Sequence, residues 1–221
     1  MSLEAKEISL CYGDGDQTTY AVRSVSVTVP EHGFFGIMGP SGSGKSSLLY
    51  LLSGLKQPTS GEVLYGTRSL SSRSETERTA IRRRSFGFVF QQPYLLSYLT
   101  ARENVLTAAL PDDDDAKTHV DSLLDDLNVG HLANRYPAHL SGGERQRIIA
   151  ARAMMNRPSI IFADEPTAAL DHTNGLAVID MLAKYRDRGA VIVVTHDPVV
   201  LESSDLIFHL ADGTLDRIEE R

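Results

Sequence analysis

The sequence predicts an α/β fold in which helices cover both sides of a mostly parallel sheet. Short apolar runs alternate along the chain with patterns at helical spacing. The clearest strands are expected at residues 34–38, 86–90, 159–163 and 191–195. These runs are apolar throughout, which is typical of strands buried on both faces of a parallel sheet. In such a sheet ligands gather at the carboxyl ends of the strands.

Two further regions differ from this pattern. Residues 5–12 and 22–29 alternate between apolar and polar side chains, which predicts half-exposed strands of an antiparallel edge or subdomain. Between residues 100 and 137 the pattern becomes helical, with a break at residues 111–115, and we expect a helical lobe inserted into the core. The four aspartates of that break are consecutive, so they repel one another and point in different directions. They predict a solvated loop before a helix rather than a metal site.

Composition narrows the class of protein. The chain has 221 residues, of which 42% are hydrophobic, enough for a sizeable core, and its formal net charge is -7. The negative balance argues against a nucleic-acid partner, because such binding depends on Lys and Arg. The basic cluster Arg82, Arg83 and Arg84 is interpreted as the solvated flank of a strand. The single cysteine, Cys11, favours a reducing compartment, and we see no signal peptide and no run long enough to span a bilayer.

A glycine-rich loop follows the first apolar strand and precedes a helical run. It reads Gly39, Pro40, Ser41, Gly42, Ser43, Gly44, Lys45, Ser46, followed by Ser47, and it fits the phosphate-binding pattern in full. Its glycines let backbone N–H groups face phosphate oxygens, Lys45 reaches the terminal phosphates, and the Ser46 hydroxyl can ligate Mg²⁺. The loop therefore predicts a site for a nucleoside triphosphate with Mg²⁺.

Two carboxylates end the apolar run of residues 160–163. Asp164 is suited to hold Mg²⁺, and Glu165, which is turned differently, is suited to polarise an attacking water as general base. An acidic turn after a strand is weak evidence alone, and its value comes from the phosphate-binding loop beside it.

A third motif, Leu-Ser-Gly-Gly-Glu-Arg-Gln-Arg, occupies residues 140–147. Locally it could be an ordinary helix N-cap with a capping glutamate, or an anion site at a helix N-terminus. As a whole string, placed between a phosphate-binding loop and an Asp-Glu strand, it matches the signature of the ATP-binding cassette ATPases. The chain resembles that family from Ile8 to about Gly213.

The resemblance implies roles for further residues. Tyr12 lies where the family has an aromatic ring that stacks on adenine, and Gln91 matches a glutamine that touches Mg²⁺ and the attacking water. His196 matches a histidine that bonds the γ phosphate. Residues 168–171, which end at Asp171, match a loop that contacts the opposite subunit, although Ala168 and Ala169 depart from the usual residues.

The resemblance also implies an assembly. Two subunits are expected to meet head to tail, so that each ATP lies between the phosphate-binding loop of one chain and Ser141, Gly142 and Gly143 of the other. The whole chain, 1–221, is expected to form one ATPase domain. Residues 1–99 and 138–221 would supply a RecA-like core with a β subdomain, and residues 100–137 the helical lobe.

Within the family, residues 36–46, 88–96 and 99–105 look most like the MacB-like ATPases, which pair with FtsX-like permeases. The chain is most similar to the ATPase subunit of a bacterial haem exporter. This similarity implies an ATPase that drives export of haem, or of another hydrophobic or amphiphilic compound, from the cytoplasmic face of the membrane. A 2:2 complex with the permease is expected, and residues 93–99 either grip it or belong to the helical lobe's core.

Two other functions stay open. One is a regulatory or mechanical ATPase that acts on a cell-wall or division partner and transports nothing. The other is a DNA-repair or ribosome-associated cassette, which is disfavoured because the chain has neither a long coiled-coil insertion nor a second cassette.

Overall fold

The computed structural model describes residues 1–14 and 17–221 and contains two sheets. The antiparallel sheet is built from β1 (Leu3–Asp14), β2 (Gln17–Val29), β4 (Ser60–Tyr65) and β5 (Arg68–Ser69), in the order β2-β1-β4-β5.

The second sheet is built from β3 (Gly33–Met38), β6 (Phe86–Val89), β7 (Ile160–Asp164), β8 (Ala190–Thr195), β9 (Leu206–Ala211) and β10 (Thr214–Glu220). Its order is β10-β9-β3-β8-β7-β6, and only the β9–β10 pair is antiparallel.

The helices are α1 (Lys45–Leu52), α2 (Glu75–Ser85), α3 (Ala101–Leu106), α4 (Ala116–Asp126), α5 (Gly142–Met154) and α6 (His172–Ala183). Short 3-10 turns lie at η1 (Gly130–Leu132), η2 (Pro137–His139), η3 (Lys184–Asp187) and η4 (Pro198–Leu201). Ser74, Thr100 and Ser141 begin α2, α3 and α5 with reciprocal capping boxes, which satisfy backbone N–H groups that a helix start leaves free.

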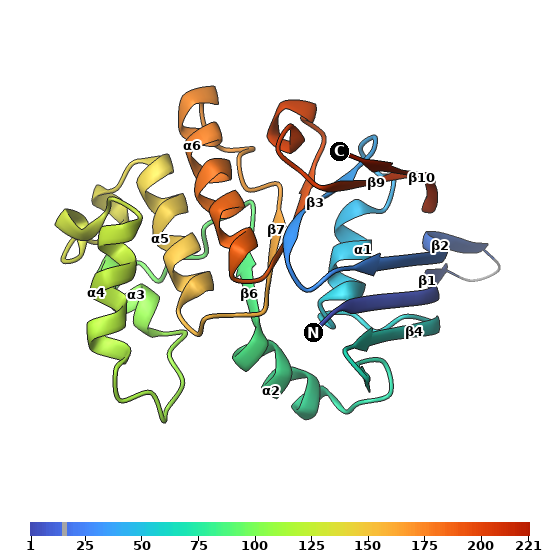
Figure 1. The fold of residues 1–221 in the computed structure, drawn as a ribbon, viewed down its shortest axis with the longest axis horizontal. Coiled ribbons are helices and arrows are strands. Elements are labelled where there is room, and N and C mark those ends of the chain that lie inside the picture. Colours follow the sequence, from blue (N-terminus) through green and yellow to red (C-terminus); the bar gives the residue numbers. More distant parts are fainter. Residues whose placement is uncertain (15–16) are drawn as a thin grey trace.

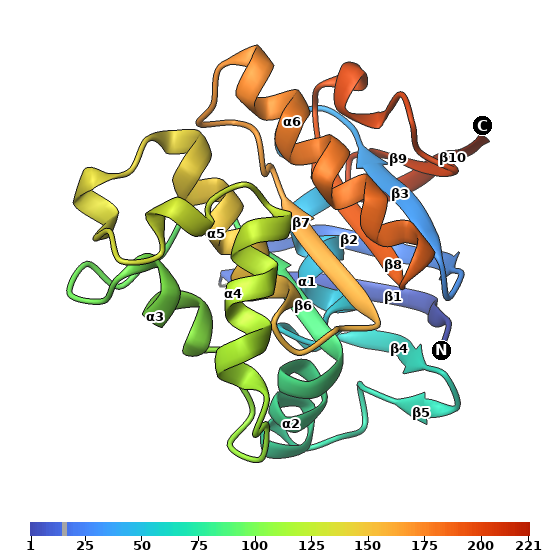
Figure 2. The same cartoon turned by 60° about the vertical axis from the view of Figure 1, so that its left-hand side comes forward.

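Side chains along the parallel strands alternate between the two faces of the sheet, and each face has its own hydrophobic core. Side chains of consecutive strand residues point to opposite faces of a sheet. Phe35 and Phe162 therefore pack with α1 and the antiparallel sheet, so that α1 lies between the two sheets (Figure 1). Phe34 and Ile161 pack on the other face with α5 and α6, and α3 and α4 lie beyond α5 (Figure 2). This arrangement holds the loop before α1 at the carboxyl edge of the parallel sheet.

The predicted fold class is confirmed. The four expected central strands are β3, β6, β7 and β8, they are parallel, and β1 and β2 are antiparallel as expected. Helices α3 and α4 lie within residues 100–137, but α5 packs in the same core, so the helical layer continues beyond that range. The division of the chain at residues 99 and 138 stays a prediction.

The basic run at residues 82–84 lies in a helix, and the acidic run at residues 111–115 lies in a turn. Arg82, Arg83 and Arg84 lie in the last turn of α2, where positive side chains favour the helix, rather than merely flanking a strand. Residues 111–115 form a turn that leads into α4, as expected. Among the described residues, no group of three or more His, Cys, Asp and Glu side chains could hold a metal ion. No helix in residues 1–14 and 17–221 is long and apolar enough to cross a membrane.

Candidate functional site

The loop between β3 and α1 has the backbone of a phosphate-binding loop. Gly42 and Gly44 have φ values of 81° and 95°, a region that favours glycine. A side chain at Gly44 would also collide with the carbonyl oxygen of Ala21. Gly44 is the N-cap of α1 and has no side chain to cap the helix, so the first N–H groups of α1 face the loop. This loop can therefore present backbone donors to an anion.

Two side chains of the loop also fit a phosphate ligand. The buried Lys45 donates from Nζ to the carbonyl oxygens of Gly39 and Pro40, at 2.8 and 2.9 Å, so its ammonium group lies across the loop. The Ser43 hydroxyl is buried and has no hydrogen-bond partner in the part of the chain that the structure describes. A buried polar atom without a partner is costly, and phosphate oxygens would satisfy both Ser43 and the lysine.

Asp164 ends β7 beside this loop. One carboxylate oxygen, Oδ1, accepts a hydrogen bond from Ser46 Oγ at 2.8 Å, and the other, Oδ2, accepts one from Tyr50 Oη at 2.8 Å. Burial, followed by the bond to Asp164 and its charge, raises the pKa of Tyr50 to about 12. Ser46 and Asp164 thus bring a hydroxyl and a buried carboxylate together. These two oxygens fit Mg²⁺, which takes one or two protein ligands and completes its shell with phosphates and waters.

Glu165 follows Asp164 but points elsewhere. Its φ of 46° places it in the left-handed region, which is uncommon for a residue with a side chain, and its N–H donates to Val194 O at 2.9 Å. The turn brings Glu165 Oε1 to 3.0 Å from Nδ1 of His196, which directly follows β8. The glutamate side chain is 18% exposed and the histidine 70% exposed. A partly buried carboxylate held by an accessible imidazole is an arrangement suited to general base chemistry.

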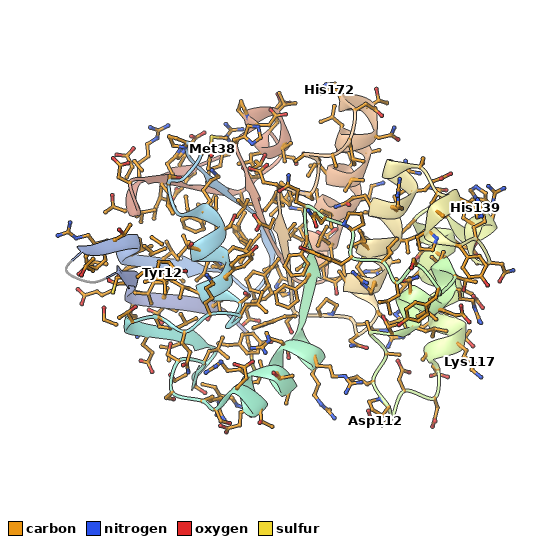
Figure 3. The ribbon with its side chains drawn as sticks, turned by 180° about the vertical axis from the view of Figure 1, so that it is seen from behind. Tyr12, Met38, Asp112, Lys117, His139 and His172 are labelled. Carbon is orange, nitrogen blue, oxygen red and sulfur yellow. The ribbon has the colours of Figure 1, made fainter. Side chains whose placement is uncertain are left out.

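Gln91 lies near this edge of the parallel sheet, whereas Tyr12 lies on the antiparallel sheet. Gln91 is exposed just after β6, and β6 pairs with β7 so that Val89 is opposite Ala163. Its backbone therefore reaches the same sheet edge as Asp164 and Glu165. Tyr12 is half-exposed on β1 (Figure 3). Lys56 Nζ donates to the Tyr12 hydroxyl at 2.6 Å and lies 5.2 Å from the centre of its ring.

The signature segment forms the start of α5. Ser141 Oγ accepts from the Glu144 N–H at 3.3 Å, and Glu144 Oε2 accepts from the Ser141 N–H at 2.7 Å. These bonds lower the pKa of Glu144. The local capping interpretation is therefore correct for these residues, and it leaves Ser141 and Gly142 exposed.

Asp171 is connected to the signature segment through Asn174. The Asp171 carboxylate caps α6 by accepting from the Asn174 N–H at 3.0 Å and from its side-chain amide at 2.6 Å, which lowers the pKa of Asp171. The Asn174 side chain in turn packs on Gly143, where an added Cβ would lie 3.0 Å from it. Asn174 and Tyr50 are not among the site residues that the sequence predicts. Their spacing, three residues after Asp171 and four after Ser46, was the available signal.

The structure thus joins some of the predicted residues and separates others. Lys45, Ser46, Asp164, Glu165, His196 and the backbone of Gln91 share the carboxyl edge of the parallel sheet. Tyr12 and His139, which is two residues before Ser141, lie on opposite sides of the molecule (Figure 3). One copy of the chain therefore does not bring its own signature segment to its own Tyr12.

Comparison with known proteins gives a consistent result. Residues 22–168 match the protein family described as ABC transporter. The chain is 38% identical over 221 residues to HrtA of Staphylococcus haemolyticus, an ATP-binding protein whose name provisionally assigns it to hemin import. That alignment covers 98% of this chain and 100% of HrtA. This chain is also 37% identical over 217 residues to the macrolide export ATP-binding/permease protein MacB of Neisseria gonorrhoeae. That alignment covers 96% of this chain and 34% of MacB.

A solved structure is similar over the whole chain. It is the dimeric post-hydrolysis state of the ATP-binding cassette MJ0796 of Methanocaldococcus jannaschii, bound to ADP and Pi. The TM-score is 0.90 at 37% identity, and the match covers 99% of this chain and 98% of that one.

Proposed function

Because this chain belongs to the ATP-binding cassette family of transporter ATPases, we propose that it hydrolyses ATP to drive export through a separate membrane permease. ATP with Mg²⁺ is its nucleotide ligand, as in that family. The observation that carries the proposal is the shared sheet edge, where Lys45, the Ser46–Asp164 pair and the Glu165–His196 pair meet. The chain is one MacB-like member of the family.

The proposed roles follow from the contacts. Lys45 exchanges its bonds to Gly39 and Pro40 for the β and γ phosphates, and Ser43 donates to the same phosphates. Residues 39–47 wrap the triphosphate, and the Tyr12 ring stacks on adenine.

The reaction step needs a water held between a base and the terminal phosphate. Glu165 Oε1 takes the proton of that water, and His196 holds the glutamate in place and contacts the γ phosphate. Mg²⁺, when bound, neutralises charge that develops on the phosphates. Ser46 and Asp164 would hold it, with the Gln91 side chain as a further contact.

The second half of the site comes from another copy of the chain. ATP-binding cassettes form dimers, as the MJ0796 structure does. His139 and His172, which lie within two residues of Ser141 and Asp171 in the sequence, are away from Tyr12 in Figure 3, and Ser141 and Gly142 are exposed. We place Ser141, Gly142, Gly143 and Asp171 against the nucleotide of the partner copy, in a head-to-tail arrangement. Closure on ATP then moves whatever is attached to the two copies.

The membrane partner is proposed to bind near residues 91–99. Tyr94 and Tyr98 are 64% and 72% exposed, while Leu95 packs against the core. Tyr94 and Tyr98 therefore fit a contact with the permease, whereas Leu95 fits the core of the helical layer. Arg152 of α5 donates to the carbonyl oxygens of Tyr94 and Pro93, at 3.0 and 3.3 Å, which fixes the segment.

A cavity beside that segment adds room for a partner helix. It has a volume of about 450 Å³, and Phe88, Phe90 and Arg152 are among its lining residues. Exposed aromatic side chains next to an apolar hollow favour a helix-in-groove contact. The partner we propose is an FtsX-like permease in a 2:2 complex, with this chain at the cytoplasmic face of the membrane. The net charge of -7 argues against a nucleic-acid partner.

Haem is the proposed cargo, on the similarity to HrtA, and export is the proposed direction, on the similarity to MacB. The test is the ATPase rate of the purified chain–permease complex in vesicles, measured with haem, macrolides and peptides. Stimulation by haem, together with its ATP-dependent movement away from the ATPase side, is the expected result. Stimulation by a macrolide or a peptide instead of haem would refute the proposal that haem is the cargo. A complex that hydrolyses ATP and moves none of them would favour the regulatory function.

A further inference from the structure

Tyr50 makes a contact that the roles above leave unused. It lies on α1 four residues after Ser46, so the two side chains share one face of the helix. Ser46 donates to Oδ1 of Asp164 and Tyr50 to Oδ2, both at 2.8 Å. One helix face thus holds both oxygens of the carboxylate that ends β7.

This pair of bonds fixes the orientation of the carboxylate. A carboxylate with one donor can rotate about its Cβ–Cγ bond, because terminal torsions of this kind are broad. With a donor on each oxygen, rotation breaks at least one charge-assisted hydrogen bond. Asp164 is also buried, so no bulk water replaces a lost donor cheaply.

The tyrosine itself is held firmly. Its ring is half-buried and packs against the core cluster that α1 shares with β1, β3 and β7. The ring cannot swing away from Asp164 without leaving that packing.

We propose that Tyr50 is a positioning residue for the metal: its hydroxyl holds Oδ2 of Asp164 so that Oδ1 stays turned toward Ser46, the two groups that would hold Mg²⁺. This inference rests on the proposed function, because it takes the nucleotide and Mg²⁺ to bind at this edge. Groups that orient a metal ligand typically contribute about 10–100-fold to metal affinity.

The test compares Tyr50→Phe with Tyr185→Phe. Each change removes one hydroxyl from a tyrosine that is at least partly buried and keeps the ring. Tyr185 Oη donates to Pro158 O, also at 2.8 Å, on the backbone just before β7 and away from Asp164. Binding of a fluorescent non-hydrolysable ATP analogue is measured in EDTA and then across a Mg²⁺ titration. The Mg²⁺ concentration that gives half of the gain in affinity reports metal binding without any turnover.

For Tyr50→Phe we expect this Mg²⁺ concentration to rise about tenfold, with affinity in EDTA unchanged. Tyr185→Phe should match the wild type in both. In an Asp164→Asn background, Tyr50→Phe should add little, because the tyrosine acts through that carboxylate.

An unchanged Mg²⁺ midpoint in Tyr50→Phe would overturn the proposal, and so would an equal shift in Tyr185→Phe or a full additive shift in the double variant. Failure of Tyr50→Phe to fold would also contradict it, by making the contact structural. Absence of Mg²⁺-dependent nucleotide binding in the wild type would instead refute the proposed function itself.

Discussion

Replacing Glu165 with glutamine tests the proposed general base. The change keeps the length of the side chain and an oxygen that can stay within reach of His196 Nδ1, which lies 3.0 Å from Glu165 Oε1. What it removes is the negative charge that accepts a proton from water. General base catalysis contributes about 10²–10⁴-fold. We therefore expect turnover to fall about a thousandfold, which corresponds to about 4 kcal/mol in the barrier.

The assay measures phosphate release and ATP binding in the same preparation. ATP affinity should stay within about twofold of wild type, since the Glu165 side chain bonds to His196 and not to a phosphate-binding residue. The ATP-bound dimer should persist because hydrolysis no longer opens it. Glu219→Gln is the matched control, because Glu219 also contacts a histidine, His209, at 2.9 Å but on the β9–β10 hairpin. Normal turnover in Glu165→Gln would remove Glu165 from this role. An equal loss in Glu219→Gln would show that the assay reports only structural damage.

Three further changes test other parts of the account. Lys45→Ala should weaken ATP binding about tenfold or more by equilibrium titration, since it removes charged hydrogen bonds to phosphate, and unchanged affinity would contradict the loop assignment. Burial, with Arg157 and Arg188 nearby, lowers the pKa of His119, so the free energy of unfolding should fall as pH drops below the ordinary value of 6.5. His119→Gln should flatten that part of the pH profile in denaturant unfolding, and an unaltered profile would refute the assignment. Arg152→Met should leave the ATPase of the isolated chain intact but weaken its co-purification with the permease, because the segment at Tyr94 is no longer fixed; tight co-purification would argue against this surface.

Much of the site could be predicted because its chemistry is local in sequence. The glycines and Lys45 of the phosphate-binding loop are consecutive, and the apolar run of β7 ends directly in Asp164 and Glu165. Strand alternation and the placement of ligands at the carboxyl edge then follow from general rules for parallel sheets.

The remaining contacts depend on how distant elements pack. Tyr50 meets Asp164 only because α1 lies on β7 in one rotational setting, and the two residues are 114 positions apart. Lys56 reaches the ring of Tyr12 across 44 positions. The left-handed backbone at Glu165 is set by its bond to Val194 on the neighbouring strand. Glutamate has no intrinsic preference for this conformation, so the sequence does not predict it. The helix that contains Arg82 was not expected, since its charged sequence lacks an apolar face.

Two copies of the chain are proposed to share each nucleotide, and a disulfide across the proposed interface tests this sharing most directly. Ser41 of the loop and Gly142 of the signature segment are both exposed, and Cys11 is the one native cysteine. A Ser41→Cys, Gly142→Cys chain is made with Cys11→Ser and Glu165→Gln, so that it closes on ATP and stays closed. Disulfides require Cα atoms within about 7 Å. We predict covalent dimers that form under mild oxidation with ATP and Mg²⁺ and not without nucleotide. Monomers under both conditions, or a bond within one chain, would contradict the shared site.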